Sequence, residues 1–435
     1  MISRIDLRGR TLSKAELLQA LPRPEQDVSS AAHTVNEIIT AVRANGLAAL
    51  NDYAQRFDKV VPPSLRVPAE RIAASLDALA PQVRAGLEEA IRRVRLGHNA
   101  QVPKDFTVDI APGAQIRQRW VPIERVGLYV PGGLAVYPSS VIMNVVPAQA
   151  AGVSSIAVVS PPQVDNDGYP DRVVLAACAL LGVEEVYAVG GAQAIAALAY
   201  GISGELEPVD LITGPGNVFV TAAKRQVQSV VGIDSEAGPT EIMVLADSTA
   251  NAEYVAADLI SQAEHDPLAA SVLVTWDEKL AQDVVVELEK QSKTATHAER
   301  ITTALGGKQS AIVLVDDLET GIRVANAYGA EHLEIHTADA AADADRITAA
   351  GAIFVGPYSP VPLGDYSAGS NHVLPTGGAA RHSAGLGVHN FVKPMQIIEY
   401  DADALAEIGP SVIAVANAER LPAHGYAIAV RHSQR

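Results

Sequence analysis

The sequence predicts an α/β protein with two parallel sheets, a helical N-terminal segment and a small C-terminal helical extension. From about residue 125 onward, short β-branched runs alternate with alanine-rich helical runs, and these runs form two separate series. Strands that are separated by helices of this length pair in parallel, so each series predicts its own sheet. The residues before the first series have the periodicity of amphipathic helices instead.

The N-terminal segment, up to about residue 120, has helical character. Residues 33–59 and 71–101 both place apolar side chains at the 3.6-residue spacing of an amphipathic helix. We therefore expect this segment to be helical.

Two series of strands follow. The first comprises residues 126–130, 155–160, 184–190 and 209–214, and the second comprises 241–247, 271–276, 311–317, 333–337 and 352–356. Runs such as SIAVVS at 155–160 are apolar on both faces, which is typical of strands in a parallel sheet. Residues 319–330 have helical periodicity and contain Gly329, the expected C-terminal cap, so that helix ends just before the strand LEIHT.

The last part of the chain changes character again. Residues 356–388 are rich in glycine, proline and serine and are predicted to form a long loop, which in a compact protein usually has a function. Two helices are expected in the tail, residues 389–435.

Composition excludes several classes of protein. The chain has 435 residues, is 48% hydrophobic and carries a net charge of −17, while aromatic residues make up only 4%. These values argue against nucleic-acid binding. Residues 127–164 are uncharged, but prolines and glycines interrupt them, so no membrane span is predicted. The N-terminus has no apolar signal region, and the single cysteine, Cys178, is expected in the core of a helix, so we expect a cytoplasmic protein.

Three glycine-rich turns occur in the first strand series. They are VPGG at 130–133, GGAQ at 190–193 and GPGN at 214–217, and each follows a strand and precedes a helix. Helix N-termini that meet at one sheet edge suit a phosphate-bearing ligand. The complete dinucleotide fingerprint is missing, because Phe219 stands where its third glycine belongs. Simple packing turns remain the competing interpretation.

Charged and imidazole side chains gather at 331–336, where the predicted helix ends and the predicted strand begins. His332, Glu334 and His336 share one face of the strand, and Glu331 points to the other. The spacing differs from that of the zinc-protease motif HExxH. An acid–base pair, a metal site and a polar strand edge all fit these residues.

Further along the chain, other side chains could bind a metal ion. A helix would place Gln262 and His265 on one face, Asp365 and His372 lie in the long loop, and His424 begins the last helix after Pro422. Imidazole, carboxylate and amide donors without a thiolate suit zinc or manganese. Unrelated surface histidines are the alternative.

Several motifs together resemble the histidinol dehydrogenase family. They are IDSEAGPTE (233–241), SQAEHDP (261–267), YGAEHLEI (328–335), PLGDYSAGSNHVLPT (362–376) and AERLPAH (418–424), with VGLYVPGG and TGPGN as further matches. The resemblance runs from about residue 20 to the C-terminus and keeps the order of the motifs.

The resemblance implies an activity and a set of residues. The family oxidises L-histidinol to L-histidine by way of histidinaldehyde, in the last steps of histidine biosynthesis, with one Zn²⁺ per subunit and two NAD⁺ in succession. Glu331 and His332 match its catalytic pair. The other matched positions are Gln262, His265, Asp365 and His424 for zinc; Thr240, Gln262, His265, His332, Asp365, Glu419 and His424 for substrate; and Tyr129, Gln193 and Asn217 for NAD⁺.

The resemblance also implies a domain organisation and an assembly. Both α/β domains are expected to be incomplete Rossmann-like folds. The expected regions are an N-terminal helical arm (1–24), a first α/β domain with the metal and catalytic residues (25–128 and 238–386), a second, NAD-binding α/β domain (129–237) and a C-terminal domain (387–435). In the family this last domain is exchanged within a homodimer, so that Glu419 and His424 enter the partner's site.

Arg420 departs from the family pattern, which usually has glycine beside Glu419. Two other functions also compete with this interpretation. A metal-dependent hydrolase of a small nitrogenous substrate would use Glu331 as its base, and a non-catalytic nucleotide-binding protein would use only the glycine turns.

Overall fold

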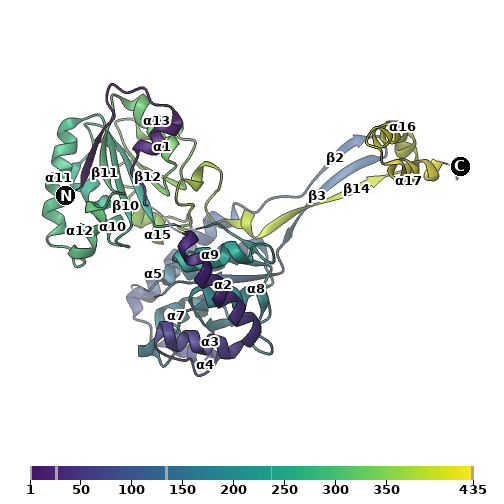
Figure 1. The fold of residues 1–435 in the computed structure, drawn as a ribbon, viewed down its shortest axis with the longest axis horizontal. Helices are drawn as coiled ribbons and strands as arrows, with labels where there is room; N and C mark the ends of the chain where they lie inside the picture. Colours follow the sequence, from purple (N-terminus) through teal and green to yellow (C-terminus); the bar gives the residue numbers. More distant parts are fainter. Residues whose placement is uncertain (1, 25–27, 133–135, 237, 433–435) are drawn as a thin grey trace.

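The computed structural model describes residues 2–24, 28–132, 136–236 and 238–432. Two α/β bodies lie side by side, and a long arm extends from them and carries the C-terminal helices at its far end (Figure 1). Among the described residues, no helix is long and apolar enough to cross a membrane.

The first body is built on sheet A, in which all the strands are parallel. Its strand order is β1 (Ser3–Asp6), β11 (Ala311–Leu314), β10 (Ala270–Thr275), β9 (Glu241–Ala246), β12 (His332–His336) and β13 (Ala352–Val355). The predicted second strand series is therefore confirmed, and β1 is an addition to it. The central strand β9 is buried along its whole length, which explains its unbroken apolar run IMVLA.

Helices cover both faces of sheet A. One face packs on α10 (Ala252–Ala263), α11 (Glu278–Ser292) and α12 (Ala298–Gly306), and the other on α1 (Lys14–Ala20) and α13 (Leu318–Tyr328). The predicted cap is confirmed, because α13 ends at Gly329 in the left-handed conformation that glycine favours. The short helices α14 (Ala340–Ala344) and α15 (Val361–Tyr366) complete this body, and α15 gives structure to the predicted loop.

The second body is built on sheet B, which is also parallel. Its strand order is β6 (Val186–Ala188), β5 (Ser155–Ser160), β4 (Arg125–Tyr129), β7 (Leu211–Thr213) and β8 (Gly232–Ile233). The crossover helices are α6 (Pro138–Ala151), α7 (Arg172–Leu180), α8 (Gly191–Tyr200) and α9 (Val218–Val227). The first predicted strand series is confirmed.

The N-terminal helices pack on sheet B, which differs from the expected grouping of residues 25–128 with 238–386. α2 (Val28–Asn45) contacts α8 and α9, α4 (Ala69–Asp77) contacts α7, and α5 (Pro81–Asn99) contacts α6. The apolar faces of these helices belong to the two cores of sheet B. Periodicity showed which faces are apolar but not which sheet they cover. The remaining short elements are α3 (Leu47–Tyr53), a π-helical turn (Ala54–Asp58) and 3₁₀ turns at Val164–Asn166, Ala379–Arg381 and Val388–Asn390.

The arm corrects the expectation that residues up to 120 are helical. β2 (Phe106–Ala111), β3 (Ala114–Pro122) and β14 (Val392–Tyr400) form an antiparallel sheet that projects from the bodies. Phe106, Val108 and Ile110 alternate with polar residues, and this two-residue period marks a strand. The N-terminal residues are likewise not purely helical, since Ser3–Asp6 form β1. The two helices expected in the tail, α16 (Ala402–Ala418) and α17 (Pro422–His432), are confirmed at the end of the arm (Figure 1).

Candidate active site

A cleft of about 800 Å³ lies between the two parallel sheets, where the carboxyl ends of the sheet B strands face the amino ends of the sheet A strands. Sheet B contributes the carboxyl end of β4 at Tyr129 and the turn after β7 at 214–217, whereas sheet A contributes Thr240 just before β9 and Glu331 just before β12. The N-terminus of α9 opens onto the cleft at Asn217 and Val218, and α10 ends at Ala263 close to His265. A helix N-terminus favours an anion and a helix C-terminus a cation, so the two walls have opposite electrostatic preferences.

The Glu331 carboxyl accepts two short hydrogen bonds. Its Oε2 accepts from the Thr240 hydroxyl at 2.6 Å and from the Glu241 backbone N–H at 2.9 Å. Burial raises the pKa of the Glu331 carboxyl, while His332 and these two donors oppose the shift. A base with a raised pKa accepts a proton more readily, which suits general base catalysis.

The His332 ring lies beside the Glu331 carboxyl, with Nδ1 3.6 Å from Glu331 Oε2. Its Nδ1 lies 3.1 Å from the Glu241 carbonyl oxygen, which can only accept, so Nδ1 carries the hydrogen. Its Nε2 is buried without a hydrogen-bond partner among the described residues, and it lies 3.9 Å from Asp365 Oδ1. In the neutral ring that nitrogen is an acceptor, so His332 is poised to take a proton.

Three of the four expected metal ligands lie around this pair. Gln262 Nε2 donates to Thr240 Oγ1 at 2.6 Å, whereas Gln262 Oε1 is buried and accepts no hydrogen bond from the described part of the chain. His265 and Asp365 line the cleft. An orphaned amide oxygen, a carboxylate and an exposed imidazole at a helix C-terminus fit a zinc ion. His372 also lines the cleft, and burial lowers its pKa, which favours the neutral ring.

The fourth expected ligand lies elsewhere. Glu419 caps the C-terminus of α16 and His424 is exposed in the first turn of α17, both at the far end of the arm. Neither residue lines the cleft of its own chain. Arg420 has a φ of 60°, the left-handed conformation for which glycine is favoured, and the turn still closes with Leu421 N–H donating to the Ala416 carbonyl.

The residues matched to NAD⁺ contacts have structural roles as well. Tyr129 is buried and its hydroxyl accepts from the Gly191 N–H at 3.1 Å, and Asn217 Oδ1 caps α9 by accepting from Phe219 and Val220. Both line the cleft, while Gln193 is buried on α8 and does not. Part of the VPGG turn lies outside the described residues.

Sequence reasoning missed two buried groups that brace the site. Glu241 lies beneath Glu331, contacts Arg23 and Tyr328, and burial raises its pKa to about 7. On the other wall, Lys224 donates to the Gly214 carbonyl and to Asp234, each at 2.6 Å, and so holds the GPGN turn. The available signal was a charged residue inside an apolar helix for Lys224, whereas Glu241 stands at the start of its apolar strand.

The two parallel sheets, the acid–base pair and the glycine turns that share one cleft define an α/β enzyme of the dehydrogenase class. A comparison with protein-family models matches residues 21–432 to histidinol dehydrogenase, so the chain belongs to that family of NAD-dependent oxidoreductases of histidine biosynthesis. The resemblance in the motifs is thereby confirmed. Membership also decides against the hydrolase and against the non-catalytic nucleotide-binding protein.

The relatives agree over the whole chain. The chain is 59% identical to histidinol dehydrogenase from Corynebacterium efficiens, over 99% of this chain and 96% of that protein. It is also 59% identical to the enzyme of the same name from Nocardia farcinica, with 99% and 98% covered. The crystal structure of histidinol dehydrogenase from Elizabethkingia anophelis superimposes with a TM-score of 0.93 at 33% identity, covering 100% of this chain and 98% of that one.

Proposed function

We propose that this protein oxidises L-histidinol to L-histidine in the cytoplasm, with two NAD⁺ reduced in succession and one catalytic Zn²⁺ per subunit. The observation that carries the proposal is the His332 ring. Its Nε2 has no hydrogen-bond partner among the described residues and lies 3.9 Å from Asp365 Oδ1, while its Nδ1 lies 3.6 Å from Glu331 Oε2. Gln262, His265 and Asp365 would hold the zinc together with His424. When bound, zinc supplies a fixed attachment for the imidazole and amine of histidinol.

His332 is the base of the first oxidation. Its Nε2 takes the hydroxyl proton as hydride leaves the alcohol carbon for NAD⁺, which yields the aldehyde and NADH. The hydrogen bond from Nδ1 to the Glu241 carbonyl keeps the ring in the required tautomer and stabilises the imidazolium that forms.

Glu331 serves the second oxidation. It takes a proton from water as the water oxygen bonds to the aldehyde carbon. The proton that His332 took in the first oxidation passes to the aldehyde oxygen, which gives the neutral hydrate. The hydrate then loses hydride to the second NAD⁺ and a hydroxyl proton to His332, which leaves the acid. A thiol route is unsuitable here, because Cys178, the only cysteine, is buried and burial raises its pKa to about 12.

NAD⁺ would bind against the second α/β domain (129–237), with Tyr129, Gln193 and Asn217 as its contacts. The N-terminus of α9 and the glycine turns at this wall suit the pyrophosphate. Thr240 would contact histidinol through its hydroxyl.

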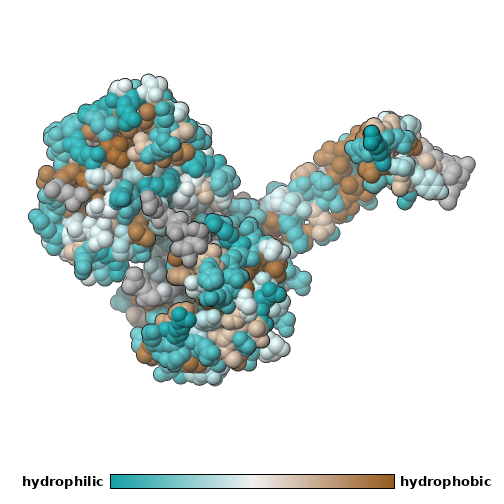
Figure 2. All heavy atoms as spheres, viewed as in Figure 1, coloured by the Kyte–Doolittle hydropathy of each residue, from teal (hydrophilic) through white to brown (hydrophobic). Residues whose placement is uncertain are grey.

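The arm supports a homodimer in which the C-terminal region (387–435) is exchanged. Figure 2 shows apolar residues gathered on the outer half of the arm, where the strands approach the C-terminal helices. The exposed apolar side chains are those of Phe106, Val108, Ile110, Met395, Ile398, Tyr400, Ile408, Val412 and Val415. Such a surface indicates a protein partner, and a second copy would bring Glu419 and His424 to the cleft, where the fourth ligand is needed.

One assay tests the proposal. Purified protein is supplied with histidinol and excess NAD⁺, and NADH is counted per histidinol consumed. About two supports the proposed reaction, and about one means that the aldehyde is released. If no NADH forms, the proposed reaction is refuted. If a monomer isolated by dilution is fully active, the exchange of the arm is refuted.

A further inference from the structure

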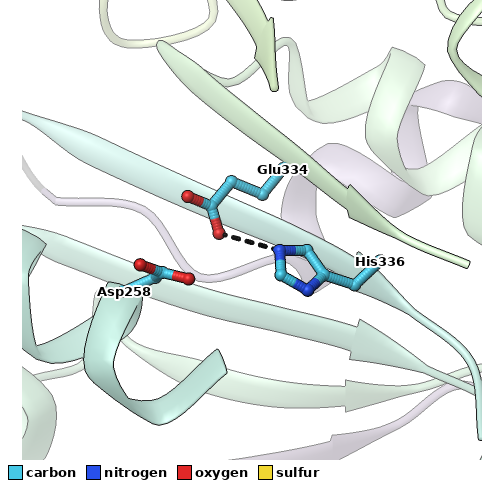
Figure 3. Close-up of side chains that lie close together, drawn as sticks. All are labelled: Asp258, Glu334 and His336. Atoms are coloured by element: carbon cyan, nitrogen blue, oxygen red, sulfur yellow. Dashed lines mark ion pairs between the residues drawn. The ribbon is translucent and has the colours of Figure 1, made fainter. Parts of the chain in front are cut away.

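A second group of metal-ligand side chains is buried beneath the cleft. Asp258 projects from α10, and Glu334 and His336 project from β12 toward a common point (Figure 3). Their residues are 8%, 0% and 5% exposed, and one ligand atom of each lies within 4.8 Å of the others. None of the three has a role in the proposed reaction.

This cluster lies one step away from the active-site residues along the same two elements, α10 and β12. Glu334 follows His332 by two residues on the same face of β12, which is a step of about 6.6 Å along a strand. Asp258 precedes Gln262 by about one helical turn on α10. The cluster therefore shares its two supporting elements with the active site but none of the side chains assigned to it.

The hydrogen bonding of Glu334 is incomplete. Its Oε1 accepts from the Val361 N–H at 2.9 Å. Its Oε2 lies 3.4 Å from His336 Nε2 and accepts no hydrogen bond from the residues that the structure describes. A fully buried carboxylate oxygen without a donor is costly, so a partner for this atom is needed.

The charges of the cluster are also unbalanced. No lysine or arginine within the described ranges forms an ion pair with Asp258 or Glu334. Burial, together with the neighbouring Glu334, raises the pKa of Asp258 to about 8, as expected for two carboxylates in one site. A proton on Asp258 and another on His336 would make the set neutral, and one divalent cation in place of both protons gives the same net charge.

We propose that Asp258, Glu334 and His336 form a second, buried Zn²⁺ site with three protein ligands that links α10 to β12 under the active site. Two carboxylate oxygens and one imidazole nitrogen are donors that zinc accepts. In a tetrahedral site such donor atoms lie roughly 3.3 Å apart. Glu334 Oε2 and His336 Nε2, at 3.4 Å, already have this separation. This site does not depend on the proposed catalytic zinc.

Metal content separates the two sites. Wild-type protein, Glu334→Gln, and the double variant His265→Ala with Asp365→Ala are saturated with Zn²⁺, desalted and analysed by mass spectrometry. We expect about two ions per chain in the wild type and about one in each variant. The ion that remains in the double variant should leave slowly in a chelator, because its ligands are buried. Glu253→Gln, at an exposed position of α10, is the matched control and should keep both ions.

Other outcomes are decisive too. About one ion in the wild type, retained in Glu334→Gln and lost in the double variant, means that the cluster binds protons only and overturns the inference. About one ion that Glu334→Gln loses and the double variant keeps supports this site and refutes the catalytic zinc instead. If Glu334→Gln does not fold, the wild-type count and the double variant still decide.

Discussion

The relay Gln262–Thr240–Glu331 gives the sharpest test of the active-site chemistry. The Gln262 amide donates to Thr240 Oγ1, and that hydroxyl donates to Glu331 Oε2, each over 2.6 Å. Thr240→Val keeps the shape of the side chain and removes the hydroxyl. A hydrogen bond to a charged group contributes about 1.5–3 kcal/mol, and that stabilisation of the ionised carboxylate is lost. The pKa of Glu331 therefore rises further.

The proposed base acts only when it is ionised, so its acidic limb moves to higher pH. At a pH on that limb, aldehyde oxidation should fall by about 10- to 100-fold, since each 1.36 kcal/mol is a factor of ten. The rate of the second NADH is measured from pH 5 to 9 with histidinaldehyde as substrate. Thr240→Ser keeps a hydroxyl and should retain the wild-type profile. A Thr240→Val profile that overlies the wild type would refute the relay.

Three further predictions concern single residues. Glu331→Gln should form the first NADH and lose the second, with aldehyde trapped by a carbonyl reagent, and unchanged aldehyde oxidation would contradict the two-base scheme. Arg420→Gly should raise the free energy of unfolding in denaturant by about 1 kcal/mol, because the φ of 60° strains a side chain; equal or lower stability would mean that the turn is unstrained. Lys224→Met should lower that free energy by about 3–5 kcal/mol and raise the KM for NAD⁺, since Asp234 stays buried and unpaired. Adding Asp234→Asn to Lys224→Met should restore part of the stability. If it does not, the loss of stability does not come from the unpaired Asp234.

The strands of the two sheets could be predicted because each is encoded by the pattern of its own residues. The run IMVLA of β9 indicates burial on both faces, and Gly329 indicates the end of α13. Neither prediction requires the residues that these elements contact elsewhere in the chain. The docking of α2 and α4 on sheet B was not predictable in this way, because an amphipathic face fits either sheet. The arm was missed for another reason. Its residues 106–110 have the two-residue period of a strand but are exposed on both faces, so no buried face marks them as part of a sheet.

The candidate site could be predicted in part: its acid–base pair was named from the sequence, but the buried Glu241 and the position of Glu419 were not. Spacing left the role of Glu331 and His332 open, and the family motif assigned them as the acid–base pair. The structure places both residues in one cleft. Glu241 was missed because an acid at the edge of an apolar strand looks like a strand end, whereas here it is fully buried. Only the fold shows that Glu419 lies at the tip of an arm, since separation along the chain carries no information about distance in space.

In the proposed reaction, the opposite orientation of the two sheets would let His332 act as a base in both oxidations. Sheet B presents the carboxyl ends of its strands and the N-terminus of α9, whereas sheet A presents the amino ends of its strands and the C-terminus of α10. In the proposed reaction the anionic pyrophosphate therefore binds one wall, and the cation with its amino alcohol binds the other. NADH can then leave and NAD⁺ can enter along sheet B while the aldehyde stays attached beside His332. If both ligands shared one wall, exchange of the cofactor would disturb the substrate that the second step requires.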